Sequence, residues 1–343
     1  MQKKLSAGSL LDDKGRLQQA GYSTSMVKKY DRSKIKASKL RIKEWDYYLV
    51  HNSKFAVALT VADNGYMGML SASVIDFEQK KEKTSSIIDL FPLGKYGMPQ
   101  TSKKGDVCLK NNQGNFSFVH DKSTRRLKVE YLKFDGEKTL SVDVVLSDEP
   151  HESMVIATPF KNKPKAFYYN QKIVGFKASG VVKYGDQEIV FDENDSVGIL
   201  DWGRGVWTYK NTWYWSSMAG EVDGHKIGFN LGYGFGDTSA ATENILFYDG
   251  YATKLKEVKF EIPTDAKGKY QYLMPWRVCD SEGKIDLSFA PIINRHSDIN
   301  LLVLRSNQNQ VFGKFSGTLK FSDGKVVEIK EMLGFAERVF NKW

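Results

Sequence analysis

Residues 201–249 read DWGRGVWTYKNTWYWSSMAGEVDGHKIGFNLGYGFGDTSAATENILFYD, and this stretch decides the interpretation of the whole chain. It contains four of the seven tryptophans: Trp202, Trp207, Trp213 and Trp215. Asp223-Gly224 is a hairpin turn signal between two strand-like runs, 212–220 and 226–233. Because side chains alternate along a strand, Trp213 and Trp215 share one face of the first run. The stretch therefore predicts a β-hairpin with a large apolar face.

The second strand of this hairpin has glycines around a single Asn230 on one of its faces. Glycine inside a strand weakens it and usually marks a bulge, a sharp bend or the close approach of a ligand or another chain. We therefore expect the strand to bend strongly, as strands do at the corner of a barrel.

The same strand-and-turn pattern continues on both sides of the hairpin. Residues 45–50, 55–62 and 66–77 predict a meander of three strands, and Ser322-Asp323-Gly324 predicts a hairpin near the end of the chain. Helical periodicity is nearly absent. Short strands with frequent turn signals are typical of barrels and sandwiches. We therefore predict an all-β fold built from two antiparallel β-barrel or sandwich halves.

Three prolines, Pro150, Pro159 and Pro164, interrupt the strand pattern near the middle of the chain. We take them as the boundary between the halves, which gives a β domain over 41–158 and a second β domain over 165–343. Residues 1–40 are polar and mixed in character. We expect them to form an arm that lies on the surface, with one short helical turn.

The chain has 343 residues and a formal net charge of +9, but its lysines are scattered and often sit beside acids. This pattern favours a solvated surface over a nucleic-acid interface. Two distant cysteines predict no disulfide framework and suit the reducing cytoplasm. No apolar run has the length of a signal peptide or a membrane span. We therefore expect a cytoplasmic protein with a small-molecule ligand, and its oligomeric state stays open.

Asp201 and Glu243 are the candidate catalytic carboxylates. Asp201 lies between apolar residues, and such a carboxylate is either paired or shifted in pKa. One interpretation is an ion pair between Asp201 and Arg204 that closes a loop. The other is a buried acid that donates a proton near neutral pH, with Glu243 and Tyr209 assisting.

The remaining candidates would bind the ligand. The tryptophans fit a hydrophobic core or a ligand-binding wall, and both interpretations stay open. The full set of candidate ligand-binding residues is Arg204, Trp207, Trp213, Trp215, Asn230, Asn244 and His151. Histidines are isolated from one another, so no metal is expected. Residues 232–236 are glycine-rich but lack the lysine of a phosphate loop, so neither a nucleotide nor another cofactor is expected.

Several of these motifs resemble a known family. They are Leu200-Asp201-Trp202-Gly203-Arg204-Gly205-Val206-Trp207, Trp213-x-Trp215-x-Ser217, Gly228-x-Asn230-x-Gly232, Thr242-Glu243-Asn244 and Gly334-Phe335-Ala336-Glu337. Together with Trp45-Asp46-Tyr47-Tyr48 near the start, they look like the uncharacterised bacterial family called domain of unknown function 2804. The resemblance covers nearly the whole chain. The family name declares no function.

A more distant resemblance, in architecture, is to the lipocalin-like carotenoid hydratase and AttH group. That resemblance implies two calycin-type halves and a relation to acid-assisted hydratases and cyclases that act on apolar small molecules. Three hypotheses follow. The protein binds an apolar or isoprenoid-like molecule and transforms it with Asp201 as proton donor, or it is a carbohydrate hydrolase using Asp201 and Glu243, or it is a non-catalytic binding protein.

Overall fold

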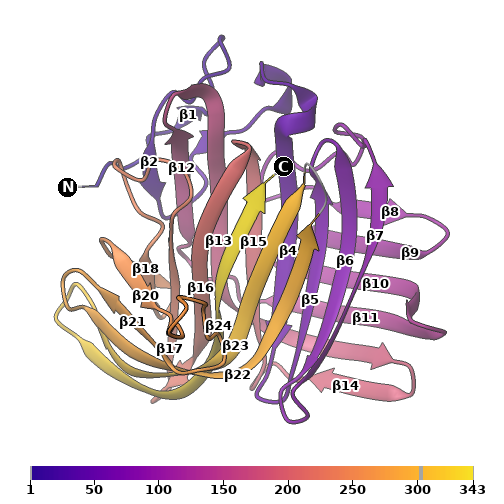
Figure 1. The fold of residues 1–343 in the computed structure, drawn as a ribbon, viewed down its shortest axis with the longest axis vertical. Coiled ribbons are helices and arrows are strands. Elements are labelled where there is room, and N and C mark those ends of the chain that lie inside the picture. The colour runs from indigo at the N-terminus through magenta and orange to yellow at the C-terminus, as the bar shows by residue number, and fades with distance from the viewer. Residues whose placement is uncertain (1, 301–303, 343) are drawn as a thin grey trace.

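The computed structural model describes residues 2–300 and 304–342, and the described chain is built almost entirely from strands (Figure 1). Two large antiparallel sheets, of 13 and 9 strands, curl into two half-barrels that face one another. The predicted all-β fold of two halves is confirmed. Within the described residues, helix is limited to two 3-10 turns, and neither is long or apolar enough to cross a membrane.

The first sheet runs in the order β7-β6-β5-β4-β15-β13-β11-β10-β9-β8, with β2, β12 and β14 attached to its side. Its strands are β2 (Gly21–Ser23), β4 (Ile42–His51), β5 (Phe55–Asp63), β6 (Met67–Asp76), β7 (Lys81–Leu90), β8 (Val107–Lys110), β9 (Gly114–Asp121), β10 (Thr124–Asp135), β11 (Lys138–Ser147), β12 (Met154–Phe160), β13 (Lys163–Tyr184), β14 (Gln187–Phe191) and β15 (Val197–Val206).

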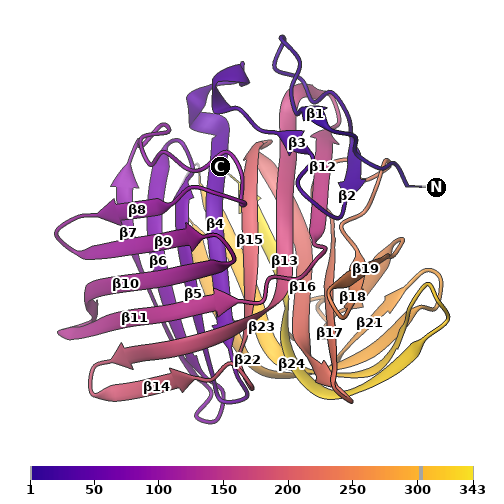
Figure 2. The ribbon, with the colours of Figure 1, turned by 180° about the vertical axis from the view of Figure 1, so that it is seen from behind.

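This sheet folds back on itself through the 22-residue strand β13. A bulge lies between Val174 and Phe176, where Gly175 has a φ of +98°, a conformation that side-chain-bearing residues rarely adopt. Before the bulge β13 pairs with β12 and β15, and after it β13 pairs mainly with β11 and β14. Figure 2 shows β8–β11 and β14 running across the direction of β4–β7 as a result. The outer face of β4–β7 is thereby covered, and their inner face is left for the site.

The second sheet runs in the order β19-β18-β17-β16-β24-β23-β22-β21-β20. Its strands are β16 (Lys210–Val222), β17 (His225–Tyr233), β18 (Ile245–Tyr248), β19 (Tyr251–Lys254), β20 (Val258–Glu261), β21 (Trp276–Asp280), β22 (Ile285–Asn300), β23 (Arg305–Lys320) and β24 (Val326–Lys342). It has its own apolar core, which includes Phe229, Phe289 and Phe315. The predicted hairpin of 212–220 and 226–233 forms β16 and β17, joined at Asp223-Gly224.

The chain passes from the first sheet to the second between Val206 and Lys210. The proline-rich segment chosen from the sequence lies inside the first sheet, because β12 contains Pro159 and pairs with β13. Proline fits there because the partner on the other side, β2, reaches only residues 155–157 of β12. The division at 158–165 is therefore not where the sheets change.

The N-terminal arm, which was expected to lie on the surface, is partly buried. It contributes β1 (Gly8–Ser9) and β3 (Lys28–Lys29), which pair with each other, and the 3-10 turns η1 (Arg32–Lys34) and η2 (Lys39–Arg41). Leu10, Leu11 and Tyr30 are buried in the main core. The arm is polar in composition, but these few apolar side chains fix it to the first sheet.

Three local patterns can be compared with the structure. The charged run 80–83 is typical of a loop, but β7 begins at Lys81, and charged side chains are tolerated there because β7 is an edge strand. The sequence of 240–244 fits either a helical turn or a loop, and these residues are irregular chain. The sequence also predicts a strand over 300–305, of which residues 301–303 lie outside the described residues.

Candidate functional site

A cavity of about 630 Å³ lies between the inner faces of the two sheets. Its walls come from β4–β7, β13 and β15 on one side and from β16 and β22–β24 on the other. The segment that follows β17 closes part of it with Phe235 and Glu243. Because strands supply most of the wall, the position of each side chain follows from strand register.

On the first sheet one row of side chains crosses the cavity. Asp201 of β15 lies opposite Lys172 of β13 on one side and Tyr47 of β4 on the other. The row continues in register through Thr60, Ser71 and Ser86. Side chains directly opposite one another on neighbouring strands share a face of the sheet. The row therefore becomes less charged and more hydroxyl-rich toward β7.

On the second sheet a matching row faces the first one. Trp215 of β16 lies opposite Glu337 of β24, Glu337 lies opposite Gln310 of β23, and Gln310 lies opposite Arg295 of β22. All four side chains line the cavity. Remote parts of the chain are thus placed side by side by pairing alone.

Three contacts join the two rows, and a fourth joins Arg295 to Ser73 of β6, two residues beyond Ser71. The Lys172 Nζ atom lies 3.8 Å from the centre of the Trp215 ring, and the Tyr47 ring packs edge-on against Trp215 with 6.0 Å between ring centres. The Tyr47 hydroxyl and the Gln310 side chain are within hydrogen-bond distance, at 3.3–3.4 Å. At the far end, Arg295 Nη1 donates to Ser73 Oγ at 2.9 Å. These contacts set the spacing between the sheets.

One end of the cavity is an aromatic box made of Trp45, Tyr168, Trp207, Trp213 and Phe235. The Phe235 ring is at the centre, with its ring centre 4.7 Å from that of Trp207, 4.8 Å from that of Tyr168 and 5.4 Å from that of Trp213. Trp45 stacks on Tyr168 and meets Trp207 edge-on. Such a box suits an apolar or unsaturated part of a ligand.

Two glycines of the sequence motifs make room for this wall. A Cβ atom on Gly203 would lie 1.9 Å from the Trp45 ring, so only glycine lets Trp45 lie flat against β15. A Cβ atom on Gly232 would lie 2.7 Å from Glu243 Oε1. The glycine-rich strand β17 therefore admits a carboxylate next to its backbone, in line with the close approach that strand glycines usually mark.

Asp201 reaches the cavity, but its partner is not Arg204. Asp201 Oδ2 lies 2.7 Å from Lys172 Nζ, and Asp201 Oδ1 accepts a 2.6 Å hydrogen bond from the Asn170 amide. Residues 201 and 204 are three apart on a strand, so their side chains point to opposite faces. The predicted ion pair between them is therefore wrong, and so is the loop that it would close.

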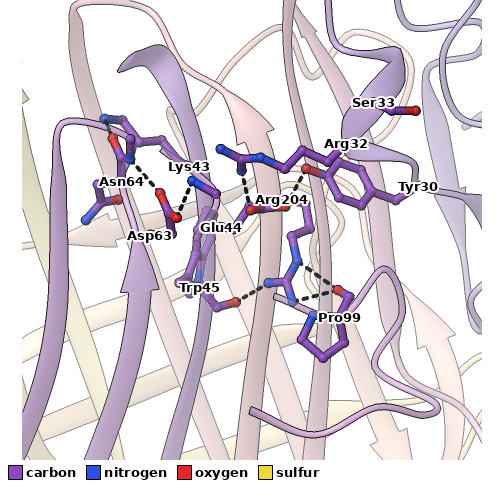
Figure 3. A network of polar contacts seen from close by, with 12 residues as sticks. Tyr30, Arg32, Ser33, Lys43, Glu44, Trp45, Asp63, Asn64, Pro99 and Arg204 are labelled. Carbon is purple, nitrogen blue, oxygen red and sulfur yellow. Dashed lines mark hydrogen bonds and ion pairs between the residues drawn. The ribbon is translucent and has the colours of Figure 1, made fainter. Parts of the chain in front are cut away.

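Arg204 lies on the buried face of β15, away from the cavity. Its guanidinium donates to Asp46 Oδ1 at 2.9 Å and to the carbonyl oxygens of Trp45 and Pro99 (Figure 3). In the same view the Glu44 carboxylate accepts from Tyr30 and Arg32. Arg204 is completely buried in this network and cannot touch a ligand in the cavity.

The cavity holds two further carboxyl groups with raised pKa values. Burial raises the pKa of Glu337 from the usual 4.5 to about 7, although Trp213 Nε1 donates to Oε1 at 3.0 Å and Gln310 Nε2 donates to Oε2 at 3.2 Å. Burial also raises the pKa of Glu243, against the opposing effect of Lys172. Burial of a carboxyl group disfavours its charged form, and here that effect exceeds the hydrogen bonds.

The segment that carries Glu243 is held from outside the cavity. The Gln2 side chain accepts from the Thr242 amide at 2.7 Å and donates to the Leu255 carbonyl at 2.7 Å. Lys254 Nζ donates to the Asn244 carbonyl at 2.6 Å, and burial lowers the pKa of Lys254 to about 7. The N-terminal arm therefore helps to position a cavity carboxyl group.

Two of the candidate ligand-binding residues support the wall from behind. Asn230 accepts from Trp215 Nε1 at 2.7 Å and donates to the Glu243 carbonyl at 2.9 Å. Asn244 accepts from the Gly232 amide and donates to the Lys256 carbonyl. Both side chains are fully buried and lie behind residues that line the cavity. They orient the site without facing the ligand.

Two other candidates lie away from the cavity. Tyr209 is about half exposed and lies beside Lys342. His151 stacks on Tyr251 and lines a smaller cavity of about 230 Å³ elsewhere on the surface. Of the candidate site residues, the structure therefore brings together Asp201, Glu243, Trp207, Trp213 and Trp215.

The sequence did not point to several cavity residues. Lys172, Tyr168, Arg295, Gln310 and Glu337 line the cavity, but none stood out as a candidate. Glu337 belongs to the Gly334-Phe335-Ala336-Glu337 motif, which was the available signal. Its significance depends on two strand partners that are distant in the sequence. Glu337 pairs with residue 215 of β16, more than 100 positions earlier, and with residue 310 of β23, about 30 positions earlier.

The cavity opens between two unpaired strand edges. β7 pairs with β6 alone, and β21 pairs only with residues 286–289 of β22, which leaves 290–300 with one neighbour in the described chain. The inner face of β7 carries Thr84, Ser86 and Ile88 into this opening, and β22 carries His296 and Ile299. A ligand can therefore enter from the side without separating paired strands.

No group of three or more His, Cys, Asp or Glu side chains that could hold a metal ion occurs among residues 2–300 and 304–342. Side chains that line the cavity supply carboxyl, ammonium, guanidinium, imidazole, indole, hydroxyl, amide and phenol groups.

Comparison with known proteins gives two similar folds and one family. A candidate AttH protein from Nitrosomonas europaea is 12% identical, with a TM-score of 0.53 over 88% of this chain and 92% of that one. Kievitone hydratase from Nectria haematococca is also 12% identical, with a TM-score of 0.51 over 88% of each chain. These likenesses show the fold alone, and no curated protein sequence matches the chain. The profile of the family described as "Domain of unknown function (DUF2804)" matches residues 2–343, so the chain belongs to that family.

Proposed function

We propose that the cavity binds a largely apolar small molecule and transforms it by acid-assisted chemistry, as a hydratase, isomerase or cyclase does. The observation that carries this proposal is Glu337. It is a buried carboxyl group in the wall of a cavity, with a pKa of about 7. An acid with a pKa near the working pH is the most effective proton donor.

The aromatic box would hold the reacting part of the ligand. Trp213 contacts both the box and the acid, because its ring packs on Phe235 and its Nε1 donates to Glu337. Protonation of a carbon–carbon double bond leaves a carbocation, and the faces of aromatic rings stabilise positive charge. Loss of a neighbouring proton would complete an isomerisation, and addition of water would complete a hydration.

Asp201 takes a different role from the one that the sequence suggested. Its carboxylate is engaged by Lys172 and Asn170, so it orients Lys172 over Trp215 and is not the proposed proton donor. Its engagement also argues against a carbohydrate hydrolase that uses Asp201 and Glu243 as the catalytic pair, because that mechanism needs two carboxyl groups free to act on one bond. Glu243, whose pKa is raised by burial, is the proposed second acid.

The fold likeness to kievitone hydratase supports the hydratase form of the proposal, as an analogy in architecture. It names no substrate for this chain. The ligand would place its apolar part in the aromatic box and any polar group toward Gln310 and Arg295.

The test starts from small molecules extracted from the purified protein and identified by mass spectrometry. These molecules are incubated with the protein in heavy water, and we expect one carbon-bound deuterium to be incorporated. Glu337→Gln should abolish this incorporation while retaining the bound molecule. Glu82→Gln, which changes a carboxylate at the edge of the same cavity, is the matched control and should incorporate deuterium as the wild type does.

Incorporation by Glu337→Gln at the wild-type rate would contradict the assignment of the acid. Retention of the molecule with no incorporation by any form of the protein would identify a non-catalytic binding protein.

A further inference from the structure

Exposed apolar side chains gather beside the cavity opening, near the end of β7 and the turn η2. Leu90, at the end of β7, is 76% exposed, and Phe91 beside it is 54% exposed. Leu40 of η2 is also exposed, as are Ile88 and Ile299 on the two sides of the opening. Scattered exposed apolar residues are normal, but a contiguous set at the opening of a ligand cavity marks an interaction surface.

Backbone contacts join the segments that carry Leu40, Leu90 and Phe91. The Phe91 amide donates to the Tyr66 carbonyl at 3.0 Å, and the Leu93 amide donates to the Gly65 carbonyl at 3.2 Å. Gly65 in turn lies against η2, because a Cβ atom there would be 2.3 Å from the Lys39 carbonyl oxygen. The segments 39–41, 64–66 and 90–93 therefore form one surface, which we call the mouth surface.

The mouth surface is joined to the cavity through β6. Leu90 lies opposite Met67 in the pairing of β7 with β6, and Met67 lines the cavity. An apolar path thus runs from the exposed Leu90 past Met67 into the space between the sheets.

Lysines surround the mouth surface. Lys39 lies within it, Lys95 follows it in the turn after β7, and Lys36 precedes η2. Lys165, near the turn between β12 and β13, lies beside this set, because its Nζ donates to the Lys36 carbonyl at 3.4 Å. The same turn also exposes Lys161 and Lys163. None of these six lysines forms an ion pair with a carboxylate in the part of the chain that the structure describes.

Several lysines on other faces are paired. Lys83, Lys128 and Lys259, for example, each lie within 3.5 Å of a carboxylate oxygen, of Asp135, Asp143 and Glu261 respectively. Near the mouth surface, Asp89 accepts from Tyr96, and the buried Asp63 accepts from the Gly94 amide. Within the described chain neither acid pairs with any of the six lysines, so these lysines present positive charge at this end of the molecule.

We propose that the mouth surface docks on an anionic phospholipid bilayer and that the ligand passes between the bilayer and the cavity through the opening beside β7. Exposed apolar side chains ringed by lysines fit such a bilayer, because the apolar groups enter the boundary between head groups and chains while the lysines meet anionic head groups. What passes through the opening rests on the proposed function, but docking itself does not.

The test is co-sedimentation with vesicles, either of phosphatidylcholine alone or of phosphatidylcholine mixed with phosphatidylglycerol. We expect binding to the mixed vesicles, reduced at least about tenfold for phosphatidylcholine alone, where each factor of ten is 1.4 kcal/mol. Because exposed charges are screened by salt, binding should also weaken as the salt concentration rises.

Two double variants separate the mouth surface from general stickiness. Leu90→Glu with Phe91→Glu should lose at least about tenfold in vesicle affinity, which is 1.4 kcal/mol. Leu273→Glu with Met274→Glu is the matched control, since these are also adjacent, exposed apolar residues, at 60% and 55% exposure, and lie outside the mouth surface. The control should bind as the wild type does. Circular dichroism and the unfolding midpoint establish that both variants are folded.

Equal binding of the two double variants would overturn the proposal, and so would failure of the wild type to bind mixed vesicles. Concentration-dependent dimers that only Leu90→Glu with Phe91→Glu removes would assign the surface to a second copy of the chain instead. Tryptophan quenching by the extracted ligand without vesicles tests the cavity separately, because Leu90 and Phe91 do not line it. Docking and the proposed function can therefore fail independently.

Discussion

The two faces of β15 both carry buried charged residues, but these residues have different surroundings. On one face Arg204 is held by Asp46 and by backbone carbonyls of Trp45 and Pro99, in a network closed to solvent (Figure 3). On the other face Asp201 borders a cavity whose further carboxyl groups, Glu243 and Glu337, are shifted toward their neutral forms. Charges that are fully engaged serve the fold, whereas acids with raised pKa values beside open space are available for chemistry.

The largest expected effect tests the closed face. Arg204→Met leaves the Asp46 carboxylate buried without its guanidinium partner, and burial already raises the pKa of Asp46. We expect the free energy of unfolding to fall by about 3–5 kcal/mol, as measured by urea denaturation. Arg126→Met is the control, because Arg126 forms an exposed pair with Asp143, and its free energy of unfolding should stay close to that of the wild type. Similar losses of unfolding free energy in the two variants would show that the buried pair of Arg204 and Asp46 does not stabilise the fold more than an exposed pair does.

The second prediction tests the cavity face through pH. The Glu337 carboxyl would lose its proton near pH 4.5 in the unfolded chain and near pH 7 in the folded protein. The folded state therefore binds more protons in this window, so the free energy of unfolding falls as the pH rises from 4.5 to 7, by about 3 kcal/mol in total. Glu337→Gln should remove the part of this decrease that Glu337 contributes, leave the part due to Glu243, and be more stable than the wild type at pH 8. A decrease of the full wild-type size in Glu337→Gln would place the titrating group elsewhere.

The third and smallest prediction concerns the spacing between β15 and the aromatic box. Gly203→Ala would force a Cβ atom against the Trp45 ring, and we expect a loss of about 1–3 kcal/mol in the free energy of unfolding, with altered tryptophan fluorescence. Gly220→Ala is the control, because there the only neighbour within 4 Å is the flexible end of Met332, and it should lose no more than about 1 kcal/mol. Equal losses of unfolding free energy in the two variants would mean that the Trp45 side chain moves aside to accommodate the added Cβ atom.

Local pattern was enough to predict the β class, the 212–233 hairpin and the shared face of Trp213 and Trp215. It also brought Asp201 and Glu243 forward as buried acids. It failed at the partner of Asp201, because nearness in sequence suggested Arg204, while strand alternation turns that side chain to the other face. Lys172, the actual partner, lies 29 positions earlier on β13 and becomes a neighbour only through antiparallel pairing.

Glu337 shows the same limit more strongly. Its raised pKa results from burial between two sheets, and its neighbours come from β16 and β23. Apart from its place in the Gly334-Phe335-Ala336-Glu337 motif, nothing in its local sequence distinguishes it from an exposed glutamate on a strand. The cavity rows are a property of register between distant strands, which a single sequence does not display.

This register also governs how such a site changes over evolutionary time. Where a site is built from loops, insertions change it gradually. Here a one-residue slip of β24 would turn Glu337 out of the cavity and turn the residues next to it on the strand into the cavity. Insertions or deletions within the paired strands are therefore excluded, whereas point substitutions along the two rows can alter the ligand one position at a time. We expect relatives of this chain to keep strand lengths constant and to vary in chemistry along the rows.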